Sequence, residues 1–138
     1  MAAKDKFHSA VRTALEKDGW TITHDPLQVK LGRIEMQIDL GAEQMLAATK
    51  GNQKIAVEIK SFLSPSFITD FYGALGQFLS YKIALEEQEP DRVLYLAVPK
   101  ETYDGFFTLD FTQTAIERYE LKIIVYAPAQ EEVVKWIK

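Results

Sequence analysis

The sequence predicts an α/β fold in which a mixed β-sheet is flanked by helices. Three observations support this class: the 138 residues match one ordinary domain, 47% of them are apolar, and helical and extended patterns alternate along the chain. The expected order is α-β-β-β-α-β, followed by a further helix, a strand and a short helix. Because no repeat or linker is visible, residues 1–138 are predicted to form a single domain.

The first periodic segment, from Lys4 to Lys17, is predicted to be a helix that ends at Asp18-Gly19. Its apolar side chains recur at helical intervals on one face: Phe7, Val11, Ala14 and Leu15. Short extended segments are expected from Trp20 to Thr23 and from Leu27 to Leu31. These elements would supply the first helix and the first strands of the fold.

Two strands, Gln44 to Thr49 and Lys54 to Phe62, are predicted to form a hairpin, because the intervening Gly51-Asn52 suits a tight turn. Side chains alternate between the faces of a strand, so Glu58 and Lys60 share one face of the second strand. The opposite face is apolar. An acid and a lysine therefore project side by side from a strand that otherwise belongs to a core.

The C-terminal half supplies one long helix and further strands. The segment Ile68 to Glu87 has no proline and places apolar residues at helical intervals, which predicts the long helix. Arg92 to Val98 is an almost continuous apolar run, typical of a strand buried on both faces, and is expected beside the strand that carries Glu58. The remaining predicted elements are a helix at Phe111 to Tyr119, a buried strand at Leu121 to Tyr126 and a short terminal helix at Glu131 to Ile137.

Composition excludes several kinds of site. The chain has no cysteine, which rules out disulfides, thiolate zinc sites and a cysteine nucleophile. Its two histidines, His8 and His24, lack a partner at ligand spacing and are expected to be capping or surface residues. The net charge of −4 disfavours tight nonspecific binding of nucleic acid through charge alone. The same net charge still allows nucleic acid to bind at a local basic groove, or where a bound metal neutralises acidic side chains.

Membrane association is not expected. No apolar run approaches the roughly 18 residues that span a bilayer. The segment Met1 to Lys6 lacks the apolar stretch of a signal peptide. A soluble, cytoplasmic protein is therefore predicted.

Asp39 lies before the hairpin, which can fold its carboxylate back towards Glu58. Two carboxylates and the backbone carbonyl of Ile59 supply the hard oxygen ligands that Mg²⁺ (or Mn²⁺) prefers. The Lys60 ammonium can stabilise charge on a phosphodiester, or help to orient and deprotonate a metal-bound water. The sequence thus predicts a site that hydrolyses phosphodiesters. Asp39 and Glu58 would bind the metal, and Lys60 would assist the reaction. The alternative is a surface ion pair between Glu58 and Lys60.

Other acids are candidates for a third metal ligand. Glu16 lies off the apolar stripe of the first helix, so a solvated position is expected for it. Asp25, Glu35 and Glu43 lie near Asp39 in the sequence. The sequence does not rank these four acids.

The arrangement of Asp39 and Glu58-Ile59-Lys60 resembles the motif of the PD-(D/E)XK nuclease superfamily. The shared core of that superfamily is a helix, a three-strand meander, a helix and a strand, so the resemblance implies a restriction-endonuclease-like core. Ile38 stands where the name-giving proline would be, at a position that varies widely in the superfamily. The resemblance implies a metal-dependent deoxyribonuclease.

Gln77 and Tyr81 lie four residues apart, on one face of the long predicted helix. They resemble the Gln-xxx-Tyr motif of RecB-like branches of the superfamily. That resemblance implies that Gln77 approaches the active site and that Tyr81 helps to position the substrate. The alternative for Tyr81 is packing with its hydroxyl at the edge of the sheet.

Over almost its whole length the chain also resembles the XisH-like proteins, named for the fdxN element excision controlling factor of cyanobacteria. The resemblance rests on five segments: LEKDGWTIT (15–23), IDLGAE (38–43), IAVEIKSF (55–62), ALGQ (74–77) and RVLYLAV (92–98). It implies a role in programmed excision of a DNA element, with DNA, a site-specific recombinase and an XisI-like companion protein as partners. It implies no defined reaction.

Two functions therefore remain open. In the first, the chain hydrolyses DNA through the predicted metal site, with Gln77 steadying it. In the second, the fold is a noncatalytic scaffold that binds DNA or the companion protein and so regulates the recombinase. Aromatic residues after Pro99, namely Tyr103, Phe106 and Phe107, would offer a binding surface for the second function if exposed, and core packing is the alternative. A homodimer is compatible with either function, because one small domain covers little duplex.

Overall fold

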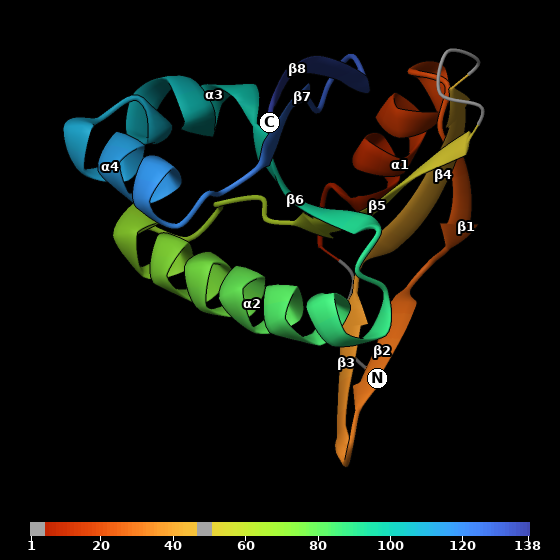
Figure 1. The fold of residues 1–138 in the computed structure, drawn as a ribbon. Helices are drawn as coiled ribbons and strands as arrows, with labels where there is room; N and C mark the ends of the chain where they lie inside the picture. The colour runs from red at the N-terminus through yellow and green to blue at the C-terminus, as the bar shows by residue number, and fades with distance from the viewer. Residues whose placement is uncertain (1–4, 47–50) are drawn as a thin grey trace.

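In the computed structural model, which describes residues 5–46 and 51–138, a mixed sheet is covered by helices on both faces (Figure 1). Among these residues the sheet has six strands in the order β1-β4-β5-β6-β7-β8, and β2 pairs with β3 in a separate ribbon. The strands are β1 Thr21–His24, β2 Leu27–Leu31, β3 Ile34–Ile38, β4 Leu40–Leu46, β5 Gly51–Ile59, β6 Arg92–Pro99, β7 Ile123–Ala127 and β8 Glu132–Ile137. The helices are α1 His8–Lys17, α2 Phe67–Gln88, α3 Lys100–Thr102, the π-helix η1 Tyr103–Phe107 and α4 Asp110–Arg118. The predicted α/β class is confirmed.

Two apolar cores lie on opposite faces of the sheet, because successive β5 side chains point to opposite sides. Ala56 belongs to the core beneath α2, whereas Ile55 and Val57 belong to the core beneath α1. The same alternation turns Glu58 towards α2. The strand that carries the candidate site is therefore covered on both faces.

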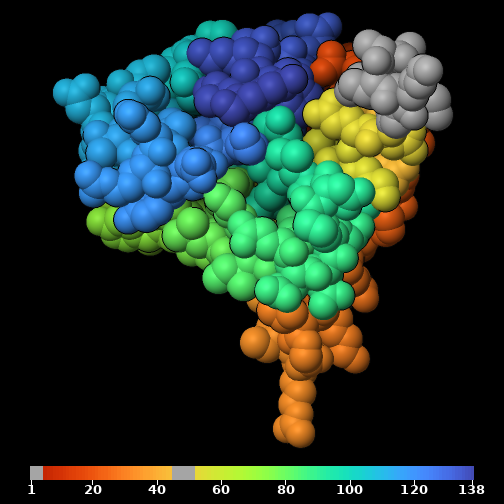
Figure 2. Space-filling model, in the orientation of Figure 1, coloured from red at the N-terminus to blue at the C-terminus, as the bar shows by residue number. Residues whose placement is uncertain are grey.

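The N-terminal helix α1 begins at His8 and ends at Lys17. Its end is the one predicted. The predicted start at Lys4 lies outside the described residues. The extended segments predicted at Trp20 to Thr23 and Leu27 to Leu31 are confirmed as β1 and β2. The β2–β3 ribbon projects from the body of the molecule (Figure 2).

Strands β4 and β5 form the predicted antiparallel hairpin, but the predicted turn is wrong. Gly51 and Asn52 lie within β5, where they pair with Leu46 and Met45. Backbone pairing along the two strands thus outweighs the turn preference of Gly51-Asn52. The connection, residues 47–50, lies outside the described residues.

The long helix α2 extends the predicted segment Ile68 to Glu87 by one residue at each end. The Ser66 side chain accepts a hydrogen bond from the Thr69 amide, which caps the start of the helix. Pro90 follows its end. In the described part of the chain, no helix is both long and apolar enough to cross a membrane.

Strand β6 runs parallel to β5, so Glu58 lies opposite Leu96. This confirms the buried strand predicted at Arg92 to Val98 and its place beside the strand of Glu58. The parallel pair requires a crossover, which α2 provides. The predicted helix Phe111 to Tyr119 and the predicted strand Leu121 to Tyr126 are confirmed as α4 and β7.

The terminal helix predicted at Glu131 to Ile137 is wrong, because this segment forms β8, antiparallel to β7. Its β-branched and aromatic residues suit a strand. Trp136 packs against Trp20, with ring centroids 5.7 Å apart, and against Tyr95 at 5.0 Å. Pairing with β7 and the contacts of Trp136 therefore decide the conformation.

The segment after Pro99 is helical and consists of α3 and η1. Tyr103, Phe106 and Phe107 are buried within it. The Phe107 ring lies 5.8 Å from the ring of Phe71 on α2. These aromatic residues therefore pack into the core, and they do not form the binding surface considered above.

Candidate functional site

Asp39 and Glu58 lie side by side where the β4–β5 ladder ends. Leu40 pairs with Val57, which places the preceding Asp39 next to Glu58. Asp39 Oδ2 accepts a hydrogen bond from the Ile59 amide at 2.8 Å, and Glu58 Oε1 accepts one from the Asp39 amide at 3.2 Å. The fold thus brings the two carboxylates together, as the hairpin led us to expect.

Burial raises the pKa of both acids. Glu58 is only 8% exposed, and desolvation, followed by the negative charge of Asp39, raises its pKa to about 8. Burial also raises the pKa of Asp39, although the hydrogen bond from the Ile59 amide opposes this. Two neighbouring carboxylates that resist ionisation make a site where a positive charge would be strongly stabilised.

Lys60 directly follows β5, and its backbone amide donates to the Ala97 carbonyl at 3.0 Å. Its charge lowers the pKa of Glu58, although burial and Asp39 outweigh this effect. Its Nζ lies towards α2, 3.9 Å from the position that a Cβ atom on Gly73 would occupy. Since Glu58 is buried, the alternative of a surface ion pair between Glu58 and Lys60 is wrong.

Of the two helix residues in the predicted motif, Tyr81 reaches the carboxylates. Its hydroxyl lies close enough to Glu58 for the two groups to affect each other's ionisation. Burial, with the charges of Glu58 and Asp39, raises the pKa of Tyr81 to about 12. The Gln77 side chain is exposed one turn earlier on α2, and its role stays a prediction.

His8 lies near the same site and is not the surface residue that was expected. It is 5% exposed, and its Nε2 lies 2.7 Å from Asp25 Oδ1, while Arg12 donates to Asp25 Oδ2 at 2.6 Å. Its Nδ1 is buried and has no hydrogen-bond partner among the described residues. A positive charge on His8 would lower the pKa of Asp39. Its position on the apolar stripe of α1 was the sequence signal for burial.

Asp5 connects the start of α1 to the end of β5. Its Oδ2 accepts a hydrogen bond from the Ser61 amide at 3.0 Å, and its Oδ1 accepts one from the Phe7 amide at 2.9 Å. Its negative charge contributes to the raised pKa values of Asp39 and Tyr126. Asp5 is therefore a further acid near the pair that sequence patterns did not reveal.

The other acids considered as a third ligand do not join Asp39 and Glu58. Glu16 and Glu35 are exposed, 4.0 Å from Arg12 and Lys30 respectively. Glu43 accepts a hydrogen bond from the Asn52 side chain at 3.5 Å. Asp25 binds His8 and Arg12. Within residues 5–46 and 51–138, no three His, Asp or Glu side chains converge as a metal site.

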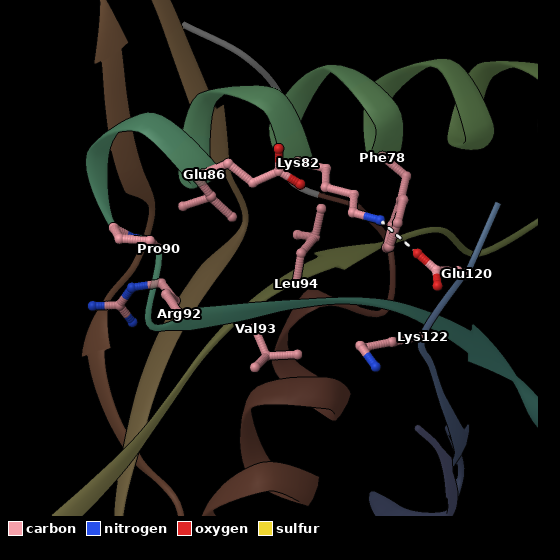
Figure 3. A pocket seen from close by; sticks show the side chains of 10 residues that line it. Phe78, Lys82, Glu86, Pro90, Arg92, Val93, Leu94, Glu120 and Lys122 are labelled. Atoms are coloured by element: carbon pink, nitrogen blue, oxygen red, sulfur yellow. Dashed lines mark ion pairs between the residues drawn. The ribbon is translucent and has the colours of Figure 1, made fainter.

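A cavity of about 280 Å³ lies elsewhere, between α2 and the start of β6 (Figure 3). Three of its charged side chains make polar contacts. Lys82 Nζ lies 3.7 Å from Glu120 Oε2, and Arg92 binds Glu89 and the Ile55 carbonyl. These contacts stabilise the fold, and the cavity does not contain the carboxylate pair.

The fold and the site define a mixed α/β protein in which a buried glutamate and a half-buried aspartate meet at the end of a central strand. A family model described as XisH protein matches residues 1–134, and the chain belongs to the XisH family. The family resemblance stated above is thereby confirmed. No match exists among curated proteins.

Two solved structures resemble the whole chain. An XisH family protein from Nostoc punctiforme PCC 73102 is 46% identical, with a TM-score of 0.89, and the match covers 97% of this chain and 100% of that one. An fdxN element excision controlling factor protein from Anabaena variabilis is 48% identical, with a TM-score of 0.89 and coverage of 98% and 100%. The fold described here is therefore that of the XisH family.

Proposed function

We propose that the chain controls excision of a DNA element through a Mg²⁺-dependent (or Mn²⁺-dependent) endonuclease-like site of the PD-(D/E)XK type. The similar Anabaena protein is named an fdxN element excision controlling factor, which supports the first half of the proposal. The Asp39–Glu58 pair supports the second half. Helix α1, the β-strands before α2, and β6 also follow the order of the proposed restriction-endonuclease-like core.

The observation that carries the proposal is the pairing of a buried carboxylate, Glu58, with the half-buried carboxylate of Asp39. Their raised pKa values mean that the pair is costly to ionise without a nearby positive charge. A purely structural role would be served at lower cost by apolar residues. The pair is therefore suited to a bound cation.

The donor chemistry fits a hard divalent cation, because Asp39 and Glu58 both present oxygen atoms. The Ile59 carbonyl and water would supply the remaining ligands. Such a metal provides Lewis-acid stabilisation of charge on a phosphodiester. The chain's own residues then orient the reacting groups: Lys60 supplies a positive charge at the scissile phosphate, and Tyr81 fixes Glu58. Gln77, on the face of α2 that carries Tyr81, steadies the site.

The proposed partners follow from the family and from the size of the domain. DNA is the substrate, and a site-specific recombinase and an XisI-like companion protein act with the chain. A homodimer would present two sites to a duplex. These assignments belong to the proposal and are tested separately from the chemistry.

A cleavage assay tests the proposed reaction. Linear, nicked, flapped and branched DNA are incubated with Mg²⁺ or Mn²⁺ and with the unaltered protein, Asp39→Ala or Lys60→Ala. Glu43→Ala is the matched control, because Glu43 lies on β4 but does not contact the pair. Metal-dependent cleavage that Glu43→Ala retains and both other variants lose is the expected result. Cleavage that survives in Lys60→Ala would contradict the proposed role of Lys60.

The second candidate is a noncatalytic regulator that binds DNA or protein. One observation favours it: among the described residues, no third acidic or histidine ligand joins Asp39 and Glu58. Under this alternative, every DNA substrate stays intact, and the Asp39→Ala variant retains excision control in cells. Loss of excision control in that variant, with its fold preserved, would instead favour the site.

A further inference from the structure

The cavity between α2 and β6 lies at a gap in the sheet. Although β6 begins at Arg92, β7 pairs with it only from Leu96 onward, opposite Ile123. The residues that precede β7 stay apart from the start of β6, and Glu120 and Lys122 among them line the cavity (Figure 3). The first residues of β6 therefore border the cavity on this side instead of a neighbouring strand.

The backbone of Leu94 faces this gap. The N–H and C=O groups of one residue in a parallel strand point to the same side, and the side alternates from residue to residue. The Leu96 amide donates to the Lys122 carbonyl at 2.9 Å, towards β7. The Ala97 carbonyl accepts from the Lys60 amide at 3.0 Å, towards β5. Leu94 has the orientation of Leu96, so its N–H and C=O groups point into the cavity, where no strand of the described chain pairs with them.

A donor and an acceptor at this position favour a ligand that pairs with both. Leu94 is only 5% exposed, and buried backbone groups in proteins are almost always hydrogen-bonded. The two groups are also fixed in place, because β6 pairs with β5 on its other side. A matching ligand presents an acceptor next to a donor. A carbonyl beside an N–H, which we call an amide edge, has this arrangement.

The rest of the cavity suits a small apolar ring. Phe78 and Leu85 line it from α2, and both side chains are buried. Figure 3 shows Phe78 and Leu94 reaching into the space between α2 and β6. The volume of about 280 Å³ is near the lower limit of small-molecule sites, roughly 300 Å³. A single ring is therefore the size of ligand that fits.

The charged side chains that line the cavity balance one another. Lys82 of α2 pairs with Glu120 at 3.7 Å (Figure 3). The Arg92 guanidinium binds Glu89 and the Ile55 carbonyl. The two remaining charges of the lining have opposite signs: Glu86 and Lys122. The cavity therefore offers no net attraction to a charged ligand, and an uncharged one is favoured.

We propose that this cavity binds a small uncharged ring with an amide edge, such as a free pyrimidine base. The ring carbonyl accepts a hydrogen bond from the Leu94 N–H, and the adjacent ring N–H donates to the Leu94 C=O. Phe78 and Leu85 cover the apolar body of the ring. The site is separate from Asp39 and Glu58, so the inference goes beyond the proposed nuclease activity and does not depend on it.

NMR titration of the isotopically labelled full chain tests the proposal with uracil, dimethyluracil and uridine monophosphate. Uracil carries the amide edge, whereas dimethyluracil is methylated on both ring nitrogens and has no N–H donor. We expect uracil to shift the amide resonance of Leu94 and dimethyluracil to bind roughly ten-fold more weakly or worse. Uridine monophosphate keeps one amide edge and adds charge, so it should bind no more tightly than uracil.

A pair of phenylalanine variants tests the apolar contact. Phe78→Leu removes a ring from the cavity lining and should weaken uracil binding several-fold. Phe71→Leu is the matched control, because Phe71 is also buried on α2 but does not line the cavity. Circular dichroism melting curves verify that both variants are folded. If Phe78→Leu is unfolded, the comparison of uracil with dimethyluracil in the unaltered chain still decides.

Several results would overturn the proposal. One is a Leu94 amide resonance that uracil does not move, and another is equal binding of uracil and dimethyluracil. Equal weakening in folded Phe78→Leu and Phe71→Leu would also count against it, because the effect would then be a general loosening of α2. Much tighter binding of uridine monophosphate would show that charge selects the ligand. The DNA-cleavage assay is unaffected by each of these results, so the two proposals fail separately.

Discussion

The Asp39 carboxylate accepts a hydrogen bond from the Ile59 amide, while the Asp39 amide donates one to the Glu58 carboxylate. A backbone amide therefore positions each acid, Asp39 between β3 and β4 and Glu58 within β5. This reciprocal arrangement holds the two carboxylates close together. It also yields predictions that can be measured without a nuclease assay.

The first prediction concerns pH. The pKa of Glu58 in the folded state, about 8, is above its ordinary value of 4.5, chiefly because of burial. The folded protein therefore binds this proton more tightly than the unfolded chain does. The stability that Glu58 contributes is fully present below about pH 4.5 and is lost as pH rises through about 8. Urea unfolding without divalent metal should show a falling free energy of unfolding over this window.

A neutral residue at the same position should remove the effect. In Glu58→Gln, the fall in the free energy of unfolding between these pH values should be much smaller than in the unaltered protein. Glu35→Gln serves as the control, because Glu35 is exposed and pairs only weakly with Lys30. An identical pH dependence in Glu58→Gln would mean that Glu58 does not titrate as described.

The second prediction concerns metal binding. Mg²⁺ or Mn²⁺ should raise the melting temperature of the unaltered protein, because a ligand that binds only the folded state stabilises it. The rise should be larger at pH 8 than at pH 5, since protons compete with the metal for Asp39 and Glu58. Asp39→Asn should abolish it and Glu43→Gln should retain it. An equal rise in Asp39→Asn would place the metal elsewhere.

The third prediction concerns Tyr81. Tyr81→Phe removes a half-buried hydroxyl near Glu58 and should lower the free energy of unfolding by about 1 kcal/mol. Tyr72→Phe, on the same helix, should change it by less than about 0.5 kcal/mol, because Tyr72 is largely exposed. Chemical denaturation of both variants provides the measurement. Equal effects would show that the Tyr81 hydroxyl makes no useful contact.

The fourth prediction concerns His8. His8→Ala leaves Asp25 without one of its partners and removes a buried ring, so a loss of about 2 kcal/mol is expected. His24→Ala should cost less than about 0.5 kcal/mol, because His24 is exposed. Thermal and urea unfolding can compare the two histidines directly. A harmless His8→Ala would contradict a structural role for the His8–Asp25 contact.

Local sequence patterns were sufficient for most of the fold. Helix α2 was predictable because its apolar residues keep a helical period over a long segment, and β6 because its apolar run lies between prolines. The segment from Glu131 to Ile137 was not, because its apolar residues fit a short helix as well as a strand. Pairing with β7, and the packing of Trp136 on Trp20 and Tyr95, settle the choice.

Part of the candidate site was also predictable from the sequence. Asp39 and Glu58 were found because strand register and a hairpin connect them. The contacts of His8 with Asp25 and of Asp5 with Ser61 join segments far apart in the chain, and no local periodicity encodes them. The approach of Tyr81 to Glu58 likewise depends on how α2 lies on the sheet.

The hydrogen bond from the Ser61 amide to Asp5 has a practical consequence for protein engineering. It fastens the segment before α1 to the residue that follows Lys60. Trimming the chain beyond Asp5 at its N-terminal side would release this anchor next to the carboxylate pair. Shortened variants should therefore keep Asp5.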